Sequence, residues 1–466
     1  MDLALKMPWV GVLVFFCVAM GPSELGDSCK ANVKFEPPTL LRMVQDTIIR
    51  GNILEDMIMK AMKNGDNSKM TKGIEGLKIE NMEIPLKGND IVMIEVEVTI
   101  TVSGERFIDG QMTITMGGEI NTIGKITSLP NGELVMKVTD CKVAVKSCKT
   151  NLPSSMLPKI GNKCLDSTLG TVMPGVLCPA ADLMMTKLKE SFDKILAKKP
   201  IGNIGYIVYE VAEKPVVCAT DVSLILKIKI EKKNGEAIPF ECDPLPDDLP
   251  TKEGKTASFF LPSSAIDALM ILYQEHLITL LTKVKGSVPT SNQLRKMLPD
   301  AGLPAGKKLK IQLTHREHPL VSMSSTGHTI TTRIQASFLD VKRGNELLSI
   351  QMVHECSALV SIKQELMAIS LKAGSCRTTE ISSPAGDVSA AKKYMETVMD
   401  AGIPNMNGVL SKNPVPFPSL INVTNTPDDA EFIFGDNMIT MYKSVEPYTP
   451  DEMAKEMKKQ FSSIKL

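Results

Sequence analysis

The chain has 466 residues, which predicts two or three domains rather than one. Lysine plus arginine equals aspartate plus glutamate at 53 each, so the formal net charge is zero. This balance argues against nucleic-acid binding and against a strongly cationic, membrane-lysing surface. Aromatic residues make up only 4% of the sequence, whereas methionine reaches 29 residues. Flexible methionine side chains suit an apolar wall that accepts varied ligands, although a methionine-tolerant core would give the same composition.

The N-terminal segment has the features of a secretory signal peptide. An apolar run over residues 8–20 follows Lys6 and precedes the small residues Gly21 and Ser23, near which we expect cleavage. The run is too short to span a bilayer, and no other stretch approaches the required length. The sequence therefore predicts a soluble, secreted protein that folds in an oxidising compartment.

The first half of the chain changes from helical to strand periodicity and back. Apolar residues recur at helical spacing after residues 36–38. Over residues 73–145 the period falls to two, and a hairpin signal at Asn131 and Gly132 supports an antiparallel meander of long strands. Helical spacing returns over residues 154–198, where Pro174 and Pro179 predict a kink or a break.

The second half repeats this order. Two strand-like runs lead into an acidic, proline-rich stretch over residues 242–250, which has the composition of a linker. A helical stripe then begins at a capping-box pattern, Ser264 to Asp267, and alternating strands and another helical stripe follow. Helix, meander and helix thus occur twice at a spacing of about 220 residues, which predicts a duplicated domain.

Two local patterns resemble those of a known family. A strand that ends at Asp140 and Cys141 is followed by a long apolar helical segment that carries Cys178 between two prolines. Near the C-terminus an apolar helix leads through a proline-rich turn, residues 414–418, into two strands that close on Gly435. In this order the patterns resemble the BPI/LBP/PLUNC lipid-binding family over residues 29–445, most of all its long PLUNC-type members, the BPI fold-containing family B.

The resemblance implies an α+β fold. Two curved antiparallel β-barrel/helix domains of BPI type would be joined by a central β-sheet into an elongated, pseudo-two-fold shape. The expected divisions are a signal peptide (residues 1–23), an N-terminal barrel domain (24–200), a central sheet and linker (201–250), a C-terminal barrel domain (251–446) and an amphipathic C-terminal helix (447–466).

The resemblance also implies a disulfide between Cys141 and Cys178 that staples the helix to the sheet. In the chain-entropy model this bridge contributes on the order of 4 kcal/mol. Nine cysteines remain once Cys17 is removed with the signal peptide. Proximity in sequence favours three further pairs and leaves Cys29 over: Cys148–Cys164, Cys218–Cys242 and Cys356–Cys376. No cysteine spacing fits a zinc site, so we expect neither a metal nor a cofactor.

Catalytic motifs are absent from the sequence, which has no GxSxG elbow, no HExxH pair and no Walker loop. His315 and His318 lie three residues apart beside a strand-like run, where side chains point to opposite faces, so a metal site there is not favoured. His354 lies close to Cys356, but adjacent strand positions favour a disulfide cysteine over a thiol–imidazole pair. The sequence therefore predicts no enzyme.

Apolar ligand binding is the favoured activity. By resemblance, each half would hold an elongated apolar pocket for acyl chains. Ten buried methylenes supply about 8 kcal/mol, whereas one lysine offers about 1 kcal/mol to an anionic headgroup, so a neutral protein can hold lipid by its tails. Most of the apolar stripes simply fill core, and the remainder line the pockets. The candidate wall residues are Leu41, Val44, Ile48, Met57, Met62, Met184 and Leu188 in the first half, and Ile266, Met270, Tyr273, Leu277, Met395 and Met399 in the second.

The C-terminal segment predicts a short amphipathic helix. It begins at a capping box from Thr449 to Glu452. One face carries Met453, Met457, Phe461 and Ile464, and it would cover a pocket mouth; the alternatives are a frayed tail and a helix on a membrane surface. Asn422 lies in the one glycosylation sequon of the chain, near a predicted strand.

The function predicted from the sequence is secreted lipid binding, with the acyl chains of phospholipid or lipopolysaccharide held in apolar pockets, in innate host defence. The balanced charge argues against direct endotoxin neutralisation, and peripheral contact with membranes is compatible with this role. Two alternatives stay open. One is lipid transfer between particles, which requires an open path or a removable lid. The other is a surfactant-like role at interfaces, which requires no bound lipid.

Overall fold

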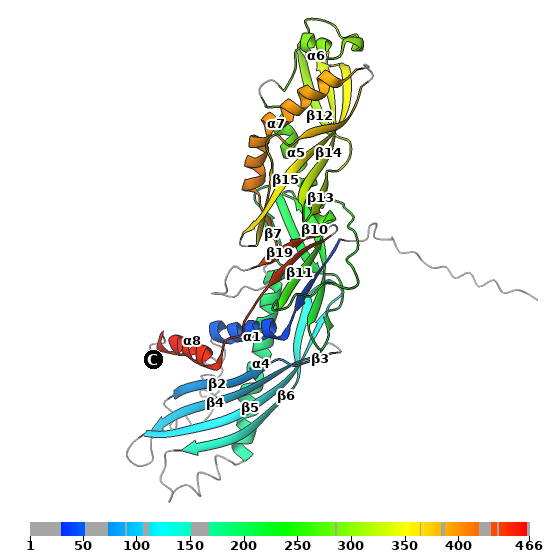
Figure 1. Ribbon diagram of the computed structural model, residues 1–466. Helices are drawn as coiled ribbons and strands as arrows, with labels where there is room; N and C mark the ends of the chain where they lie inside the picture. Colours follow the sequence, from blue (N-terminus) through cyan, green and yellow to red (C-terminus); the bar gives the residue numbers. More distant parts are fainter. Residues whose placement is uncertain are drawn as a thin grey trace, which may run out of the picture.

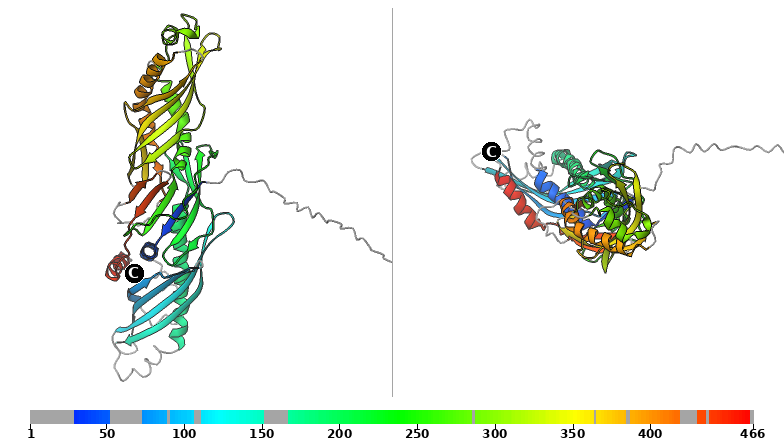
Figure 2. Two further views of the ribbon diagram at one scale, coloured as in Figure 1. Left: turned by 45° about the vertical axis from the view of Figure 1, so that its right-hand side comes forward. Right: turned by 90° about the horizontal axis from the view of Figure 1, so that it is seen from above.

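The computed structural model describes residues 29–51, 73–88, 91–105, 111–150, 167–284, 287–363, 365–383, 387–418, 430–435 and 438–463. Over these residues the molecule is long and narrow, and three antiparallel sheets follow one another along its length (Figure 1). The two end sheets curl beside helices, and the third joins them (Figure 2). The predicted fold class, two curved barrel/helix domains on a central sheet, is confirmed.

The first-half sheet has the strand order β2-β4-β5-β6, and β3 pairs with β4. Its strands are β2 (Gly73–Glu83), β3 (Leu86–Gly88), β4 (Ile91–Glu105), β5 (Gln111–Ser128) and β6 (Leu134–Thr150). One face of β4 is buried at every second residue, as in Val92, Ile94 and Val96, which explains the period of two in the sequence. Two helices accompany this sheet: α4 (Ser167–Leu196) packs against β6, and α1 (Pro37–Gly51) packs against α4.

The predicted break in the long helix is not present. α4 continues as one helix of 30 residues through both Pro174 and Pro179. Proline removes a backbone donor and crowds the preceding turn, but a helix held by tertiary packing can tolerate this cost. The Cys141–Cys178 bridge and the packing on β6 hold α4 to the sheet on both sides of Pro179.

The central sheet interleaves distant parts of the chain, in the order β19-β20-β11-β1-β10-β8-β7, with β9 paired to β10. Its strands are β1 (Lys30–Phe35), β7 (Lys199–Ile201), β8 (Gly205–Val211), β9 (Val216–Val217), β10 (Val222–Lys232), β11 (Ala257–Pro262), β19 (Glu431–Phe434) and β20 (Met438–Lys443). It thus takes strands from both halves, and the domain boundaries drawn from the sequence stay a prediction. The ring of Phe259 packs edge-on against Tyr209 and against Phe417, each at 6.0 Å between centroids, so an aromatic cluster joins the two halves.

The second-half sheet has the order β12-β14-β15-β16-β18, with β13 paired to β14 and β17 to β15. Its strands are β12 (Leu309–His315), β13 (Leu320–Ser324), β14 (Gly327–Asp340), β15 (Glu346–Lys363), β16 (Leu366–Leu371), β17 (Arg377–Ser382) and β18 (Val415–Pro416). Its helical elements are α5 (Ser264–Leu281), α6 (Ser291–Met297), the 3₁₀ turn η1 (Pro299–Ala301) and α7 (Ser389–Lys412). α5 and α7 pack against each other beside this sheet (Figure 1).

The capping box predicted at the start of α5 is not formed. The helix begins after Ser263, whose side chain makes no capping hydrogen bond. Asp267 instead accepts a hydrogen bond from the backbone N–H of Val321 on β13, at 2.5 Å. Burial raises the pKa of this carboxyl to about 6, against the opposing effect of the Val321 bond. Asp267 therefore makes a tertiary contact with β13 in place of the local helix cap that the sequence pattern predicts.

Three disulfides join described residues: Cys29–Cys242, Cys141–Cys178 and Cys356–Cys376. The expected Cys141–Cys178 bridge is present, with 5.8 Å between its Cα atoms. The Cys218–Cys242 pairing was wrong, because Cys242 bonds Cys29, and Cys218 is free and exposed. β1 runs antiparallel to β10. Cys29 directly precedes β1 and bonds Cys242, which lies 213 residues later in the sequence. Cys164 lies outside the described residues.

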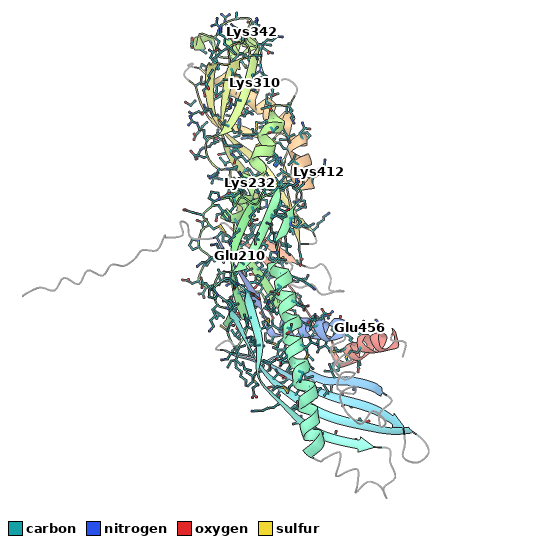
Figure 3. All side chains as sticks on the ribbon, turned by 180° about the vertical axis from the view of Figure 1, so that it is seen from behind. Glu210, Lys232, Lys310, Lys342, Lys412 and Glu456 are labelled. Carbon is teal, nitrogen blue, oxygen red and sulfur yellow. A yellow bond between two sulfur atoms is a disulfide. The ribbon has the colours of Figure 1, made fainter. Side chains whose placement is uncertain are left out.

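Charged side chains are spread over the length of the molecule, and Figure 3 labels four lysines and two glutamates between Lys342 at the tip of the second half and Glu456 on the C-terminal helix. Many are in short-range pairs, such as Glu210 with Lys229 at 2.6 Å and Lys232 with Glu236 at 3.3 Å. Within the described residues, no helix is both long and apolar enough to cross a bilayer.

Candidate functional site

The second half encloses an apolar cavity between α5, α7 and the inner face of strands β12, β14, β15 and β16. The cavity has about 40 Å³ of free space. Its lining is dominated by aliphatic and methionine side chains, among them Met270, Leu277, Leu281, Ile334, Met399 and Met406. Gln274, His315 and Thr332 are the polar exceptions.

A smaller cavity adjoins the first and has about 10 Å³ of free space. The two share three lining residues, Leu281, Ile334 and Met399, so these side chains lie between them. Met395 and His354 line the smaller cavity but not the larger one. We call the two cavities and their shared lining the inner seam.

The predicted wall residues of the second half fall into two groups. Met270, Leu277 and Met399 line the larger cavity, and Met395 and Met399 line the smaller one. Ile266 and Tyr273 are buried in the core but line neither cavity. The hydroxyl of Tyr273 donates to the backbone carbonyl of Asn413 at the end of α7, so this side chain joins two helices.

The predicted wall residues of the first half lie in the core between α1, α4 and the sheet. Val44, Ile48, Met184 and Leu188 are buried, and Leu41 is partly buried against the same cluster. Met57 and Met62 lie outside the described residues. A lipid-contacting role for this group stays a prediction.

The free space of the inner seam is small. Ligand pockets for small molecules measure ~300–1,000 Å³, whereas a single water needs about 10–15 Å³. An acyl chain therefore enters the seam only if the wall side chains move apart. Four methionines supply that freedom, because an unbranched thioether has several accessible rotamers of similar energy: Met270, Met395, Met399 and Met406.

Two neutral histidines line the inner seam, His354 in the smaller cavity and His315 in the larger one. Burial lowers the pKa of His354 to about 4, with a small opposing effect from Glu396, and burial also lowers the pKa of His315 to about 4. Sequence reasoning considered both residues only for metal binding or thiol chemistry. The strand register gives the missing signal, because His315 pairs with Ile334 and His354 with Thr332, which places both rings on the inner face.

A wider hollow lies elsewhere on this half and is polar. It has about 510 Å³ of free space and is lined by strands β14, β15 and β17 and the chain after β12. Arg333 and Glu317 form an ion pair at its rim. Its charged lining makes it a poor site for an acyl chain.

The C-terminal helix α8 (Pro450–Ser463) lies on the first half of the molecule, although it follows the second half in sequence (Figure 1). It packs against β2, an edge strand of the first-half sheet, and against α1. Met453 and Met457 are buried in the core at 1% and 5% exposure. The predicted capping box is formed, since Glu452 N–H donates to Thr449 Oγ1 at 3.3 Å and Thr449 N–H donates to Glu452 Oε2 at 2.9 Å. Phe461 lies near the end of the helix, and Ile464 lies outside the described residues.

A polar contact, which we call the latch, holds the segment before α8 to α1. The guanidinium of Arg42 lies 3.4 Å from the centroid of the Tyr448 ring and donates to the carbonyl of Glu446 at 2.9 Å. Gln45 and Tyr448 exchange two hydrogen bonds, of 2.9 and 2.6 Å, through the Gln45 amide and the Tyr448 backbone. Burial, and next the Asp46 carboxylate, raises the pKa of the Tyr448 hydroxyl.

Among the described residues, no group of three or more His, Cys, Asp and Glu side chains is arranged to hold a metal ion. The lining of the inner seam offers apolar contact together with a few hydrogen-bonding groups. Asn422 lies outside the described residues, so its glycosylation stays a prediction.

Comparison with known proteins agrees with this geometry. A family model described as the LBP / BPI / CETP family, N-terminal domain, matches residues 35–189. BPI fold-containing family B member 6 of Homo sapiens is 28% identical over 318 residues, which are 64% of this chain and 70% of that protein. BPI fold-containing family B member 3 of Rattus norvegicus is 22% identical over 372 residues, 76% of this chain and 78% of that protein.

The fold has a solved counterpart. A crystal structure of lipopolysaccharide binding protein superposes with a TM-score of 0.57 at 13% identity, and covers 89% of this chain and 98% of that one. The resemblance found in the sequence is therefore confirmed: residues 35–189 match the LBP / BPI / CETP N-terminal domain, the chain has the BPI-type fold of two joined halves, and it is similar to the PLUNC-type BPI fold-containing family B proteins.

Proposed function

We propose that this chain is a secreted lipid-binding protein that holds the acyl chains of an amphipathic lipid in the apolar interior of its two halves. The observation that carries the proposal is the inner seam, a methionine-lined interior between two helices and a curled sheet in a BPI-type fold. A crystallised protein of this fold is titled lipopolysaccharide binding protein, and the family model that matches residues 35–189 carries the LBP and BPI names. Binding, rather than catalysis, is the role that such a lining supports.

Apolar contact supplies most of the affinity in this proposal. Each buried methylene contributes about 0.8 kcal/mol, so a chain of ten methylenes offsets the cost of moving several side chains. The formal net charge of zero gives no general attraction to anionic headgroups. We therefore favour phospholipid over lipopolysaccharide as the ligand class.

α8 is the proposed cover of the first half. Its two buried methionines, Met453 and Met457, cover the edge of the first-half core. The latch holds the segment that directly precedes α8 against α1. A cover that opens and closes is also what lipid transfer between particles requires, so transfer is the second candidate function. The segment over residues 1–23 and the three disulfides support secretion. Host defence is the proposed setting, because a solved protein of this fold is named for binding lipopolysaccharide, a bacterial lipid.

The test is mass spectrometry of lipid extracted from protein purified without detergent. We expect near-stoichiometric phospholipid or a related amphiphile. Vesicle-to-vesicle exchange of a labelled phospholipid then separates sequestration, which is slow, from transfer, which is fast. Absence of extracted lipid together with a lowered surface tension would support the surfactant role and refute the proposal.

A further inference from the structure

His354 occupies an unusual position in the inner seam. It is 1% exposed, and it lines the smaller cavity together with Met395, Val398 and Met399. Its Nδ1 lies 3.1 Å from the hydroxyl of Thr378. Its Nε2 is buried and has no hydrogen-bond partner among the described residues. Buried polar groups in folded proteins are almost always paired, so an orphan beside a cavity indicates a missing partner.

The ring cannot easily turn toward another partner. His354 and Thr378 are directly paired across strands β15 and β17. Thr378 is itself 1% exposed, and its backbone N–H donates to the carboxylate of Glu396 on α7 at 2.9 Å. The strand pairing and the helix thus hold the imidazole in its orientation beneath α7. Burial keeps it neutral near pH 7, so Nε2 either donates or accepts one hydrogen bond.

We propose that the inner seam binds a neutral, single-chain lipid that carries a hydroxyl group, such as a long-chain alcohol or a monoacylglycerol, with the hydroxyl bonded to His354 Nε2. This inference rests on the proposed lipid-binding function; for the inner seam it names a single-chain lipid with a hydroxyl in place of the phospholipid favoured for the molecule as a whole. The chain would extend along Ile334, Leu281 and Met399 from the smaller cavity into the larger one.

The chemistry of the site selects this class over its neighbours. A hydroxyl both donates and accepts, so it satisfies Nε2 in either tautomer. A carboxylate would bring an unpaired charge into an apolar interior, which is far more costly than a hydroxyl. A zwitterionic or anionic phosphate headgroup cannot enter for the same reason, and such a lipid would be held by its tails alone.

The test compares three ligands with the same chain: 1-dodecanol, dodecanoate and dodecane, each delivered from the same cyclodextrin carrier at pH 7.4. Affinities are measured by calorimetry for the wild-type chain and for His354→Phe, which replaces the imidazole by an apolar ring. We expect the variant to bind 1-dodecanol about tenfold more weakly, with the dodecane affinity changed less than twofold. The wild-type chain should bind dodecanoate more weakly than 1-dodecanol.

Matched variants separate this effect from a general change of packing. His328→Phe changes a histidine on β14 that lines neither cavity, and it should leave all three affinities unchanged. His354→Gln retains a hydrogen-bonding group and should keep part of the preference for the alcohol. If His354→Phe does not fold, His354→Leu provides the same apolar replacement with a smaller side chain.

An unchanged ratio of 1-dodecanol to dodecane affinity in His354→Phe or His354→Leu would overturn the inference, as would tighter binding of dodecanoate. Both results leave general lipid binding intact. If none of the three ligands binds and no lipid is extracted from the purified protein, the proposed function itself fails.

Discussion

Removing the guanidinium of Arg42 should release the C-terminal helix while leaving the rest of the fold in place. The substitution is Arg42→Met, which keeps an apolar stem of similar length. Arg42 is only 7% exposed, so its contacts are made largely out of water and should each be near the upper end of their usual range. The expected result is more frequent local opening of α8 and of the segment before it.

The magnitude follows from the contacts that are lost. The cation stacked on Tyr448 contributes about 2 kcal/mol when desolvated. The charged hydrogen bond to the Glu446 carbonyl contributes roughly 1.5–3 kcal/mol. Arg42 Nε also lies 3.7 Å from the carboxylate of Asp46, which is buried, so removing the cation adds the cost of a buried carboxylate that has lost this ion pair. The retained methionine stem and the Gln45 bonds offset part of the loss, so we expect a net change of about 3 kcal/mol, or roughly 100-fold in the opening equilibrium.

Amide hydrogen exchange of α8 measures this opening directly. Peptides that cover residues 447–463 should exchange about 100-fold faster in Arg42→Met, while peptides from the second-half sheet should not change. Lys455→Met is the control, since Lys455 lies on the exposed face of the same helix. Unchanged protection of α8 in Arg42→Met would refute the reasoning, because the latch would then not hold the helix.

Four further outcomes are expected. Deletion of residues 447–466 should speed lipid exchange in a vesicle assay, and an unchanged rate would remove α8 as a cover. Between pH 7 and pH 4.5 the wild-type chain should lose about 2 kcal/mol of stability more than His354→Phe in urea unfolding, because the folded pKa of His354 near 4 lies below the unfolded value of 6.5. This stability is fully present above pH 6.5 and is lost progressively as the pH falls below it. Equal pH dependence of the two proteins would count against a buried neutral imidazole. Replacing Cys29 and Cys242 by serine should lower the free energy of unfolding by about 5 kcal/mol, because the bridge closes a separation of 213 residues, whereas loss of the Cys356–Cys376 bridge, with a separation of 20, should lower it by about 3 kcal/mol. Urea unfolding of the two variants measures both losses, and the opposite ranking would contradict this expectation. Phe259→Ala should destabilise the junction of the halves by roughly 3–5 kcal/mol, and a loss below 1 kcal/mol would show that the aromatic cluster is not essential to it.

The sequence predicts the sheets well because one face of each long strand is buried. In β10 every second residue from Val222 to Ile230 is buried, and the alternation is therefore visible without any tertiary information. The duplicated order of helix, meander and helix follows from the same signal. The Cys356–Cys376 bridge could also be found, because Cys356 on β15 and Cys376, directly before β17, are only 20 residues apart in the sequence.

Features that depend on distant contacts could not be found this way. The partner of Cys242 is set by the position of β1 beside β10, which local spacing does not encode. Asp267 has the spacing of a capping residue, but β13 supplies it with a better donor. The candidate wall was predicted from methionine and aliphatic stripes alone, so Met270 and Met399 were found, whereas His354 was set aside until the strand register placed it on the inner face.

The strand order of the central sheet bears on how this protein is made. β1 is synthesised more than 200 residues before its neighbour β11, and β20, which pairs with β11, follows later still. Until β11 follows, β1 presents an unpaired hydrogen-bonding edge that other nascent chains could join, and β11 presents such an edge until β20 follows. If the two halves are expressed separately, β1 of the first half and β11 of the second half should each have an unpaired edge. The halves should then either recombine through these edges into the native pair or precipitate.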